Sequence, residues 1–266
     1  MSQSACTLVY RVLLDLSDHR LQVLRQLLTP EERARADRYL VPHATSQYIG
    51  CRAALRWLLA QTMDSALDRV VIKTERWGKP YLIASIQADE RTSNKSEVVP
   101  PLYFNVSHSG QLGLIALSPG IVGVDIEHLK PRIHARSLVA QVLSTAEQQA
   151  WSQLPAHRQV EQILRLWVCK ESLLKAMGLG IAECLKMVSF KLPIEDQAQI
   201  AVSQIEPAIQ LHLEEADNCH RHLWTSPHSW RIHRLPVDQD YFAVVATQSN
   251  QLTVSTVDFQ WPEEFS

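Results

Sequence analysis

The chain has 266 residues, of which 46% are hydrophobic and 20% charged, so it can bury one large core or two modest ones. Its 28 acidic and 26 basic side chains give a net charge of −2, which provides no global attraction to nucleic acid or to acidic membranes. The longest apolar stretches, such as 112–117 and 55–60, fall far short of the roughly 20 residues of a membrane span, so we expect neither a span nor a signal peptide.

The first half of the chain alternates strand and helix patterns. Residues 8–14 predict a strand, and the segment from Thr29 to Glu32 combines an N-cap threonine, a proline at the first helical position and a glutamate three residues after the cap. A helix should therefore begin at residue 30. The later elements that we expect are a helix over 48–63, a strand over 70–73, a polar loop over 87–101, and short strands over 103–106, 113–117 and 121–126.

The second half repeats this order. Ser144 begins another capping box, a long helix should cover 159–177, and 241–245 read as a closing strand. A shift of 115 residues places Thr29 on Ser144, and a shift of 120 places 121–125 on 241–245. We therefore expect an α/β fold of the α+β type, with two pseudo-symmetric α/β halves over 1–119 and 120–266 and a binding cleft between them.

A strand with two acidic residues is the first feature that carries chemistry. In the segment 123–127 (GVDIE), alternation places Asp125 and Glu127 on one face and Val124 and Ile126 on the other. Two carboxylates that point the same way repel each other unless a cation or a shared proton compensates. An oxygen-only pair suits Mg²⁺ or Mn²⁺, although a solvated acidic strand edge would look the same in sequence.

Two further segments carry polar side chains at suggestive spacings. On the predicted helix, Glu171 and Lys175 are one turn apart, which fits either an acid and base pair or a simple helix-stabilising ion pair. The segment 104–110 (FNVSHSG) is a strand that runs into a polar turn, where Ser107 and His108 could receive phosphate oxygens or only hydrogen-bond the turn. The turn at 77–80 (WGKP) needs no functional explanation by itself.

Together and in this order, these motifs closely resemble the Sfp-type 4′-phosphopantetheinyl transferase family, in the larger form that carries two halves in one chain. The resemblance spans about 8–246 and includes the capping segment at Thr29, WGKPYL at 77–82, FNVSHSG at 104–110, GVDIE at 123–127, LSTAE at 143–147 and WVCKESLLKAMGLG at 167–180. It implies the fold of that family, with the active site between the halves. It also implies a holo-[acyl-carrier-protein] synthase type of activity, in which the phosphopantetheine of coenzyme A is moved to a carrier-protein serine and adenosine 3′,5′-bisphosphate is released.

The resemblance also implies roles for individual residues. Asp125, Glu127 and Glu171 would hold Mg²⁺, Lys175 would contact the pyrophosphate, and Glu171 would accept the serine proton, a task that a metal-bound water or Asp125 could share. Coenzyme A would further contact a set of basic and polar residues, namely Arg35, Lys79, Ser107 and His108.

The chain also departs from the family at two places. Glu32 stands where the family often has a basic residue for the 3′-phosphate, which leaves Arg35, with Arg33 or Arg38 as alternatives, for that role. Ser46-Gln47 replace a usual arginine before the second helix. The sequence therefore leaves open how the 3′-phosphate is bound.

The remaining expectations concern partners and surroundings. We expect an apo acyl or peptidyl carrier protein, usually an acidic helical bundle, as the partner, no nucleic acid, no membrane, and a monomer, since both halves lie in one chain. Five scattered cysteines without a CxxC pair predict a reducing cytoplasm, and the cysteine and histidine cluster at 219–233 fits no common zinc spacing.

The rival hypotheses are a catalytically silent homologue, another Mg²⁺-dependent nucleotide enzyme and a nucleic-acid-binding module. Every matched catalytic position is filled, which argues against the first. The absence of a GxxxxGK[ST] loop or a GxGxxG motif argues against the second, and the slightly acidic balance against the third.

Overall fold

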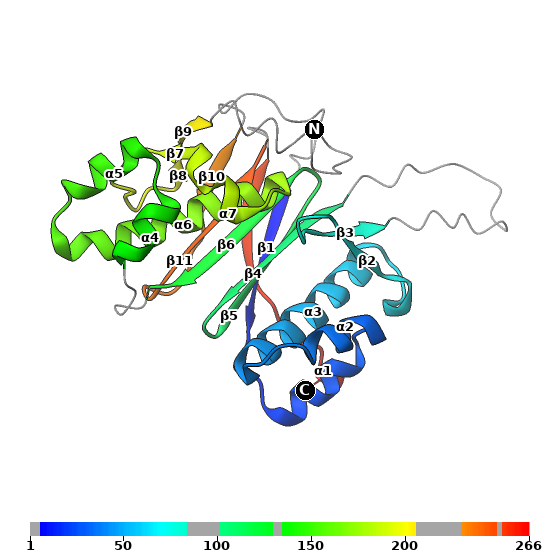
Figure 1. Ribbon diagram of the computed structural model, residues 1–266. Helices are drawn as coiled ribbons and strands as arrows, with labels where there is room; N and C mark the ends of the chain where they lie inside the picture. The colour runs from blue at the N-terminus through cyan, green and yellow to red at the C-terminus, as the bar shows by residue number, and fades with distance from the viewer. Residues whose placement is uncertain (1–5, 84–101, 130–134, 206–229, 249–251, 266) are drawn as a thin grey trace, which may run out of the picture.

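A computed structural model describes residues 6–83, 102–129, 135–205, 230–248 and 252–265 of the chain. Helices and sheets are mixed, as Figure 1 shows, which confirms the predicted α+β class. The predicted polar loop at 87–101 and most of the cysteine and histidine cluster, up to residue 229, lie outside these ranges. None of the helices in the described ranges is long and apolar enough to cross a membrane.

The first sheet has the strand order β12-β1-β5-β4. Its strands are β1 (Cys6–Leu13), β4 (Tyr103–Ser109), β5 (Leu112–Ser118) and β12 (Thr253–Asp258). All neighbours are antiparallel except β1 and β12, which run parallel. The strand β12, near the C-terminus, therefore completes the sheet that the N-terminal residues begin. The division of the chain into halves over 1–119 and 120–266 stays a prediction.

Three helices accompany the first sheet, and one of them, α3, packs on it. These helices are α1 (Asp18–Gln26), α2 (Pro30–Ala36) and α3 (Pro42–Thr62), and the β2–β3 hairpin follows them at Val71–Thr74 and Pro80–Ile83. The apolar face of α3, with Leu55 and Leu59, is buried against Val12 and Ile115 of the sheet. This burial fixes which face of α3 remains for a ligand.

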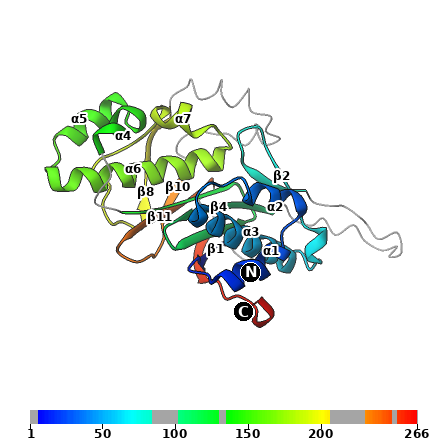
Figure 2. The ribbon, with the colours of Figure 1, turned by 60° about the horizontal axis from the view of Figure 1, so that its bottom comes forward.

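The second sheet has the order β6-β11-β10-β8 and is antiparallel. Its strands are β6 (Val122–His128), β8 (Gln199–Ile200), β10 (Arg231–Arg234) and β11 (Tyr241–Thr247). The long helix α6 (Ala156–Met177) crosses one face of this sheet, as Figure 2 shows from a second angle. The smaller elements of this part are α4 (Ala135–Val142), α5 (Thr145–Ser152), α7 (Ile181–Cys184), β7 (Val188–Phe190) and β9 (Val202–Ile205).

The two sheets meet where their edge strands β4 and β6 lie side by side (Figure 1). A core of small and branched side chains from β5, β6 and β11, including Leu114, Val124 and Val245, joins them. Val124 and Ile126 lie in this core, as alternation predicted. The opposite face of β6 is therefore available for the acidic side chains.

The capping motifs in the sequence predicted the starts of two helices correctly. Both capping boxes form, with Thr29 and Glu32 paired at α2 and Ser144 and Glu147 paired at α5. The helix predicted over 48–63 begins earlier, at Pro42, because proline is well suited to the first helical turn. The helices α1 and α4 were not predicted, since they span only nine and eight residues.

Candidate active site

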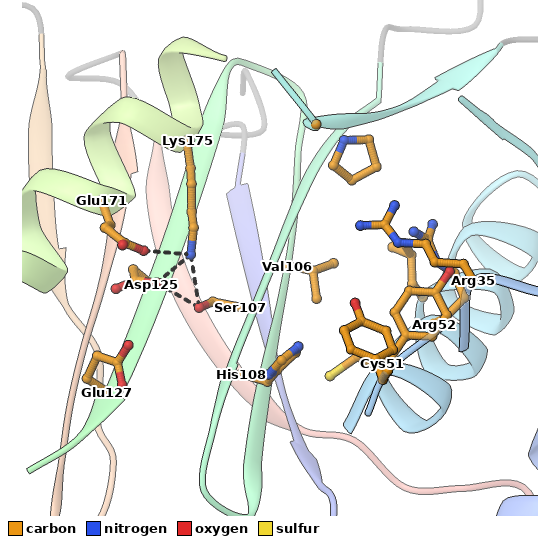
Figure 3. Close-up of a pocket in the computed structure, with 15 residues that line it drawn as sticks. Arg35, Cys51, Arg52, Val106, Ser107, His108, Asp125, Glu127, Glu171 and Lys175 are labelled. Carbon is orange, nitrogen blue, oxygen red and sulfur yellow. Dashed lines mark hydrogen bonds and ion pairs between the residues drawn. The ribbon is translucent and has the colours of Figure 1, made fainter. Parts of the chain in front are cut away.

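A pocket of about 290 Å³ lies between α3 on one side and β4, β6 and α6 on the other. Most of the residues predicted for the site line it, namely Arg35, Ser107, His108, Asp125, Glu127, Glu171 and Lys175. Figure 3 shows the carboxylates and Lys175 on one wall and two arginines on the other. The pocket thus brings together residues separated by up to 140 positions in the chain.

The acidic wall is built by β6 and α6. Asp125 and Glu127 project from the same face of β6, and Glu171 and Lys175 project from adjacent turns of α6. Gly123 allows the two elements to approach, because a Cβ there would lie 2.0 Å from the backbone oxygen of Ser172. The absence of a side chain at Gly123 therefore sets the separation between the two sources of carboxylates.

The strand β4 supports this wall through alternate side chains. Asn105 Oδ1 accepts a hydrogen bond from Val124 N at 2.8 Å, and Ser109 Oγ donates to Glu127 Oε2 at 2.8 Å. Between them, Ser107 Oγ donates to Asp125 Oδ1 at 2.7 Å. The FNVSHSG motif therefore joins the edges of the two sheets and orients both carboxylates of β6, a function that the sequence did not reveal.

Lys175 lies at the centre of the acidic wall. Its Nζ is 2.5 Å from Asp125 Oδ1, 3.1 Å from Ser107 Oγ and 3.4 Å from Glu171 Oε2. Burial disfavours the charged ammonium, but the carboxylates of Asp125 and Glu171 outweigh it and raise the pKa of Lys175. Lys175 is therefore protonated and partly neutralises the acidic cluster.

The carboxyl group of Glu171 titrates far from its usual range. Burial, and then the Asp125 carboxylate, raise the pKa of Glu171 to about 7. A carboxyl group with this pKa can both accept and release a proton near neutral pH, which is what general acid or base catalysis requires.

The acidic wall has the donor chemistry for a hard divalent cation. Asp125 is 1% exposed, and its Oδ2 makes no hydrogen bond within the described ranges although it is buried. Such an oxygen is costly unless a ligand or cation meets it. Yet among the described residues no three histidine, cysteine or acidic side chains are grouped closely enough to hold a metal ion. The Lys175 ammonium lies between Asp125 and Glu171 and contacts both carboxylates. Asp125, Glu127 and Glu171 as metal ligands therefore stay a prediction.

The opposite wall contains a cationic group that the sequence analysis missed. Arg52 of α3 lines the pocket with Arg35, and both guanidinium groups lie over the ring of Tyr48, at 5.6 and 5.5 Å from its centroid. Glu32 Oε1 is 3.7 Å from Arg52 Nε, so the acidic residue that departs from the family pattern supports an arginine. The one feature of the sequence that pointed to Arg52 was the acidic residue at position 32, where the family often has a basic one.

Two polar atoms of this wall are buried without a partner. Neither Arg52 Nη1 nor Tyr48 OH makes a hydrogen bond of good geometry to any residue that the structure describes, although the two side chains lie close together. Both residues line the pocket. A buried donor without a partner costs free energy, and an anionic ligand in the pocket would satisfy it.

Lys79, which the resemblance places near the nucleotide, does not line the pocket, although Gly78 and Pro80 beside it do. Its Nζ donates a hydrogen bond of 2.7 Å to the backbone oxygen of Ala176, at the end of α6. A cation at this position is favourable because a helix carries partial negative charge at its C-terminus. Lys79 therefore ties the β2–β3 hairpin to the helix that carries Glu171 and Lys175.

Comparison with known proteins decides the family. The model of the 4′-phosphopantetheinyl transferase superfamily matches residues 121–243, and the model of the N-terminal part of 4′-phosphopantetheinyl transferases matches 15–120. The 4′-phosphopantetheinyl transferase HetI of Nostoc is 31% identical over 213 residues, which cover 79% of this chain and 84% of HetI. This chain belongs to the 4′-phosphopantetheinyl transferase superfamily.

Two further proteins similar to this transferase carry the same family assignment. A Synechocystis protein, provisionally assigned the same activity, is 29% identical over 250 residues, which cover 89% of this chain and 88% of its own. The 4′-phosphopantetheinyl transferase psf-1 of Bacillus pumilus is 27% identical over 187 residues, which cover 70% and 73% of the two chains. The family resemblance predicted from the sequence motifs is thereby confirmed.

A buried ion pair in this phosphopantetheinyl transferase holds α6 from the side opposite the pocket. Lys170, which precedes Glu171, is fully buried and donates to Glu147 Oε2 at 2.6 Å, to Val142 O at 2.7 Å and to Leu185 O at 2.9 Å. Glu147 also accepts hydrogen bonds from the backbone of Ser144 and Phe190. The network joins α6 to four neighbouring segments and holds the turn that carries Glu171.

Proposed function

We propose that this phosphopantetheinyl transferase takes the 4′-phosphopantetheine group from coenzyme A and attaches it to a serine of an apo acyl or peptidyl carrier protein. It would use Mg²⁺ or Mn²⁺, act in the manner of a holo-[acyl-carrier-protein] synthase and release adenosine 3′,5′-bisphosphate. One observation carries the proposal: a single pocket has three carboxylates and a lysine on one wall and two arginines on the other. This arrangement suits a substrate with a pyrophosphate and a separate phosphate monoester.

The residues of the acidic wall can perform the transfer. The serine hydroxyl would attack the phosphorus next to the pantetheine arm, the bond from that phosphorus to the bridging pyrophosphate oxygen would break, and Glu171 would accept the serine proton. The raised pKa of Glu171, about 7, suits this acceptor. The Lys175 ammonium would stabilise the charge that develops on the departing phosphate.

A divalent cation, when bound, would neutralise the pyrophosphate charge, and Asp125, Glu127 and Glu171 are the residues that would hold it. The buried Asp125 Oδ2 without a hydrogen-bond partner in the described ranges supports this assignment. Binding would require Lys175 to share Asp125 and Glu171 with the metal, because its ammonium contacts both.

The nucleotide end of coenzyme A would lie against the basic wall. Arg35 and Arg52 offer guanidinium groups that match phosphate oxygens, and Tyr48 OH offers one more hydrogen bond. His108 borders the same pocket from β4. Lys79 would act on the nucleotide only indirectly, through the hairpin that supplies Gly78 and Pro80 to the pocket.

Intact-mass spectrometry tests the proposal. An apo carrier protein incubated with the enzyme, coenzyme A and Mg²⁺ should gain about 340 Da, the mass of phosphopantetheine joined to a serine with loss of water. The gain should disappear with a chelator, return with added Mg²⁺, and be absent with Glu171→Gln. Coenzyme A binding without any gain on several unrelated carriers would contradict the proposal and favour the silent homologue.

A further inference from the structure

An exposed apolar segment stands between α2 and α3. Every residue from Asp37 to His43 is exposed, and within this run Tyr39, Leu40 and Val41 are 37%, 98% and 59% exposed. Among the described residues only four other large apolar side chains are exposed, and no two of those are adjacent in the chain. A single exposed leucine is ordinary, but three consecutive apolar side chains indicate a contact surface.

The segment lies at the mouth of the pocket. Tyr39 lines the pocket, and its ring is 5.5 Å from the ring of Tyr48 on the basic wall. Leu40 and Val41 follow directly and precede Pro42, the first residue of α3. A protein that delivers a side chain into the pocket from this side would therefore meet Leu40 and Val41.

The surroundings of the segment are basic. Arg35, Arg38 and His43 are exposed on both sides of it. Of the nearby acidic residues, Asp37 pairs with Arg25 at 2.8 Å and Glu32 lies 3.5 Å from the buried Arg56, while Glu31 is exposed on the first turn of α2. An apolar centre with a charged rim is the usual composition of a protein interface, and here the rim is positive.

We propose that residues 38–43 form a docking surface for the acidic protein substrate, with Leu40 and Val41 as its apolar contacts and Arg38 facing carboxylates of the partner. In the proposed function, on which this inference rests, that partner is the apo carrier protein. A second copy of this chain is a poorer occupant, because a two-fold contact would bring the same arginines face to face.

The double variant Leu40→Ser/Val41→Ser tests the surface. The KM for the apo carrier should rise about tenfold or more, while the KM for coenzyme A should stay unchanged and the unfolding temperature should not fall, since Val41 is the N-cap of α3 and serine is favoured there. Val257→Ser is the matched control, since Val257 is 41% exposed on β12, at the edge of the first sheet farthest from β4. Arg38→Glu should also raise the carrier KM, and by less at high salt.

Direct binding of the apo carrier to the immobilised enzyme, measured without coenzyme A, separates this inference from the proposed function. Binding that the double variant loses and Val257→Ser keeps supports the surface even if no transfer occurs. An unchanged carrier KM, a carrier that does not bind the wild-type chain, or a parallel loss of coenzyme A binding would overturn it. A wild-type dimer in sedimentation that the double variant dissolves would assign the surface to self-association instead.

Discussion

Gly123 of β6 and Ala176 of α6 lie so close together that no side chain fits between them. A Cβ at Gly123 would be 2.4 Å from Ala176 N and 2.9 Å from Ala176 Cα. The contact is between backbones, so no flexible side chain can move to relieve it. The close approach of α6 to β6 at Gly123 brings Glu171 and Lys175 to the carboxylates of Asp125 and Glu127.

Gly123→Ala should therefore displace α6, lower the unfolding temperature and abolish most of the transfer activity. Overpacking of this kind typically costs about 1–3 kcal/mol or more. Gly120→Ala is the control, because among the described residues a Cβ there meets only Leu252 Cδ1, at an ordinary 3.5 Å. Thermal unfolding and the mass assay measure both effects, and equal behaviour of the two variants would contradict the assigned role of Gly123.

Loss of Lys170 should destabilise the protein strongly. Lys170→Met leaves the Glu147 carboxylate, which is 2% exposed, without its cation, and breaking a buried ion pair costs about 3–5 kcal/mol. The double variant Lys170→Met/Glu147→Gln should recover part of this loss, because the uncompensated charge is removed. Urea unfolding gives the free energy of unfolding of the wild type, of Lys170→Met and of the double variant. A greater loss in the double variant than in Lys170→Met would show that the two residues are not coupled.

Arg52 should decide how well the enzyme distinguishes coenzyme A from its dephospho form. Arg52→Gln should raise the KM for coenzyme A by about tenfold to a hundredfold, as the loss of a charge-assisted hydrogen bond predicts, and change the KM for dephospho-coenzyme A far less. Steady-state kinetics with both substrates measure this. An equal loss for the two substrates would place Arg52 away from the 3′-phosphate.

Acid should destabilise the fold partly through His233 of β10. Burial, and then the charge of Arg231, lower the pKa of His233 below 6.5, so the folded state binds this proton less readily than the unfolded state. The contribution to stability is therefore complete above pH 6.5 and is lost as the pH falls through the folded-state pKa.

We expect His233→Gln to lose less unfolding free energy between pH 7.5 and pH 5.5 than the wild type loses. Urea denaturation at the two pH values measures the difference. Parallel losses in the two proteins would mean that other groups carry the acid sensitivity.

Much of the acidic wall could be predicted because its signals are local. The two-residue period of a strand places Asp125 and Glu127 on one face, and the helical period places Glu171 and Lys175 one turn apart. Capping boxes also depend on residues three positions apart, and both were found at the predicted positions. These features need no knowledge of the rest of the fold.

Several features of the basic wall and of the supports behind the site could not be predicted. Arg52 faces the carboxylates only because α3 packs beside β4, and Ser107 meets Asp125 only because two sheet edges lie together. The hydrogen bond from Lys79 to the end of α6 also depends on the tertiary structure, and the contact of Lys79 with the nucleotide stays a prediction.

The sequence alone therefore determined the local arrangement of the acidic wall: Asp125 and Glu127 on one face of a strand, and Glu171 and Lys175 one turn apart on a helix. The tertiary structure decided which walls face one another and which side chains support others. The reason is physical. Backbone periodicity acts over a few residues, whereas the packing of β4 against β6 and of α6 on Gly123 depends on the shapes of surfaces far apart in the chain.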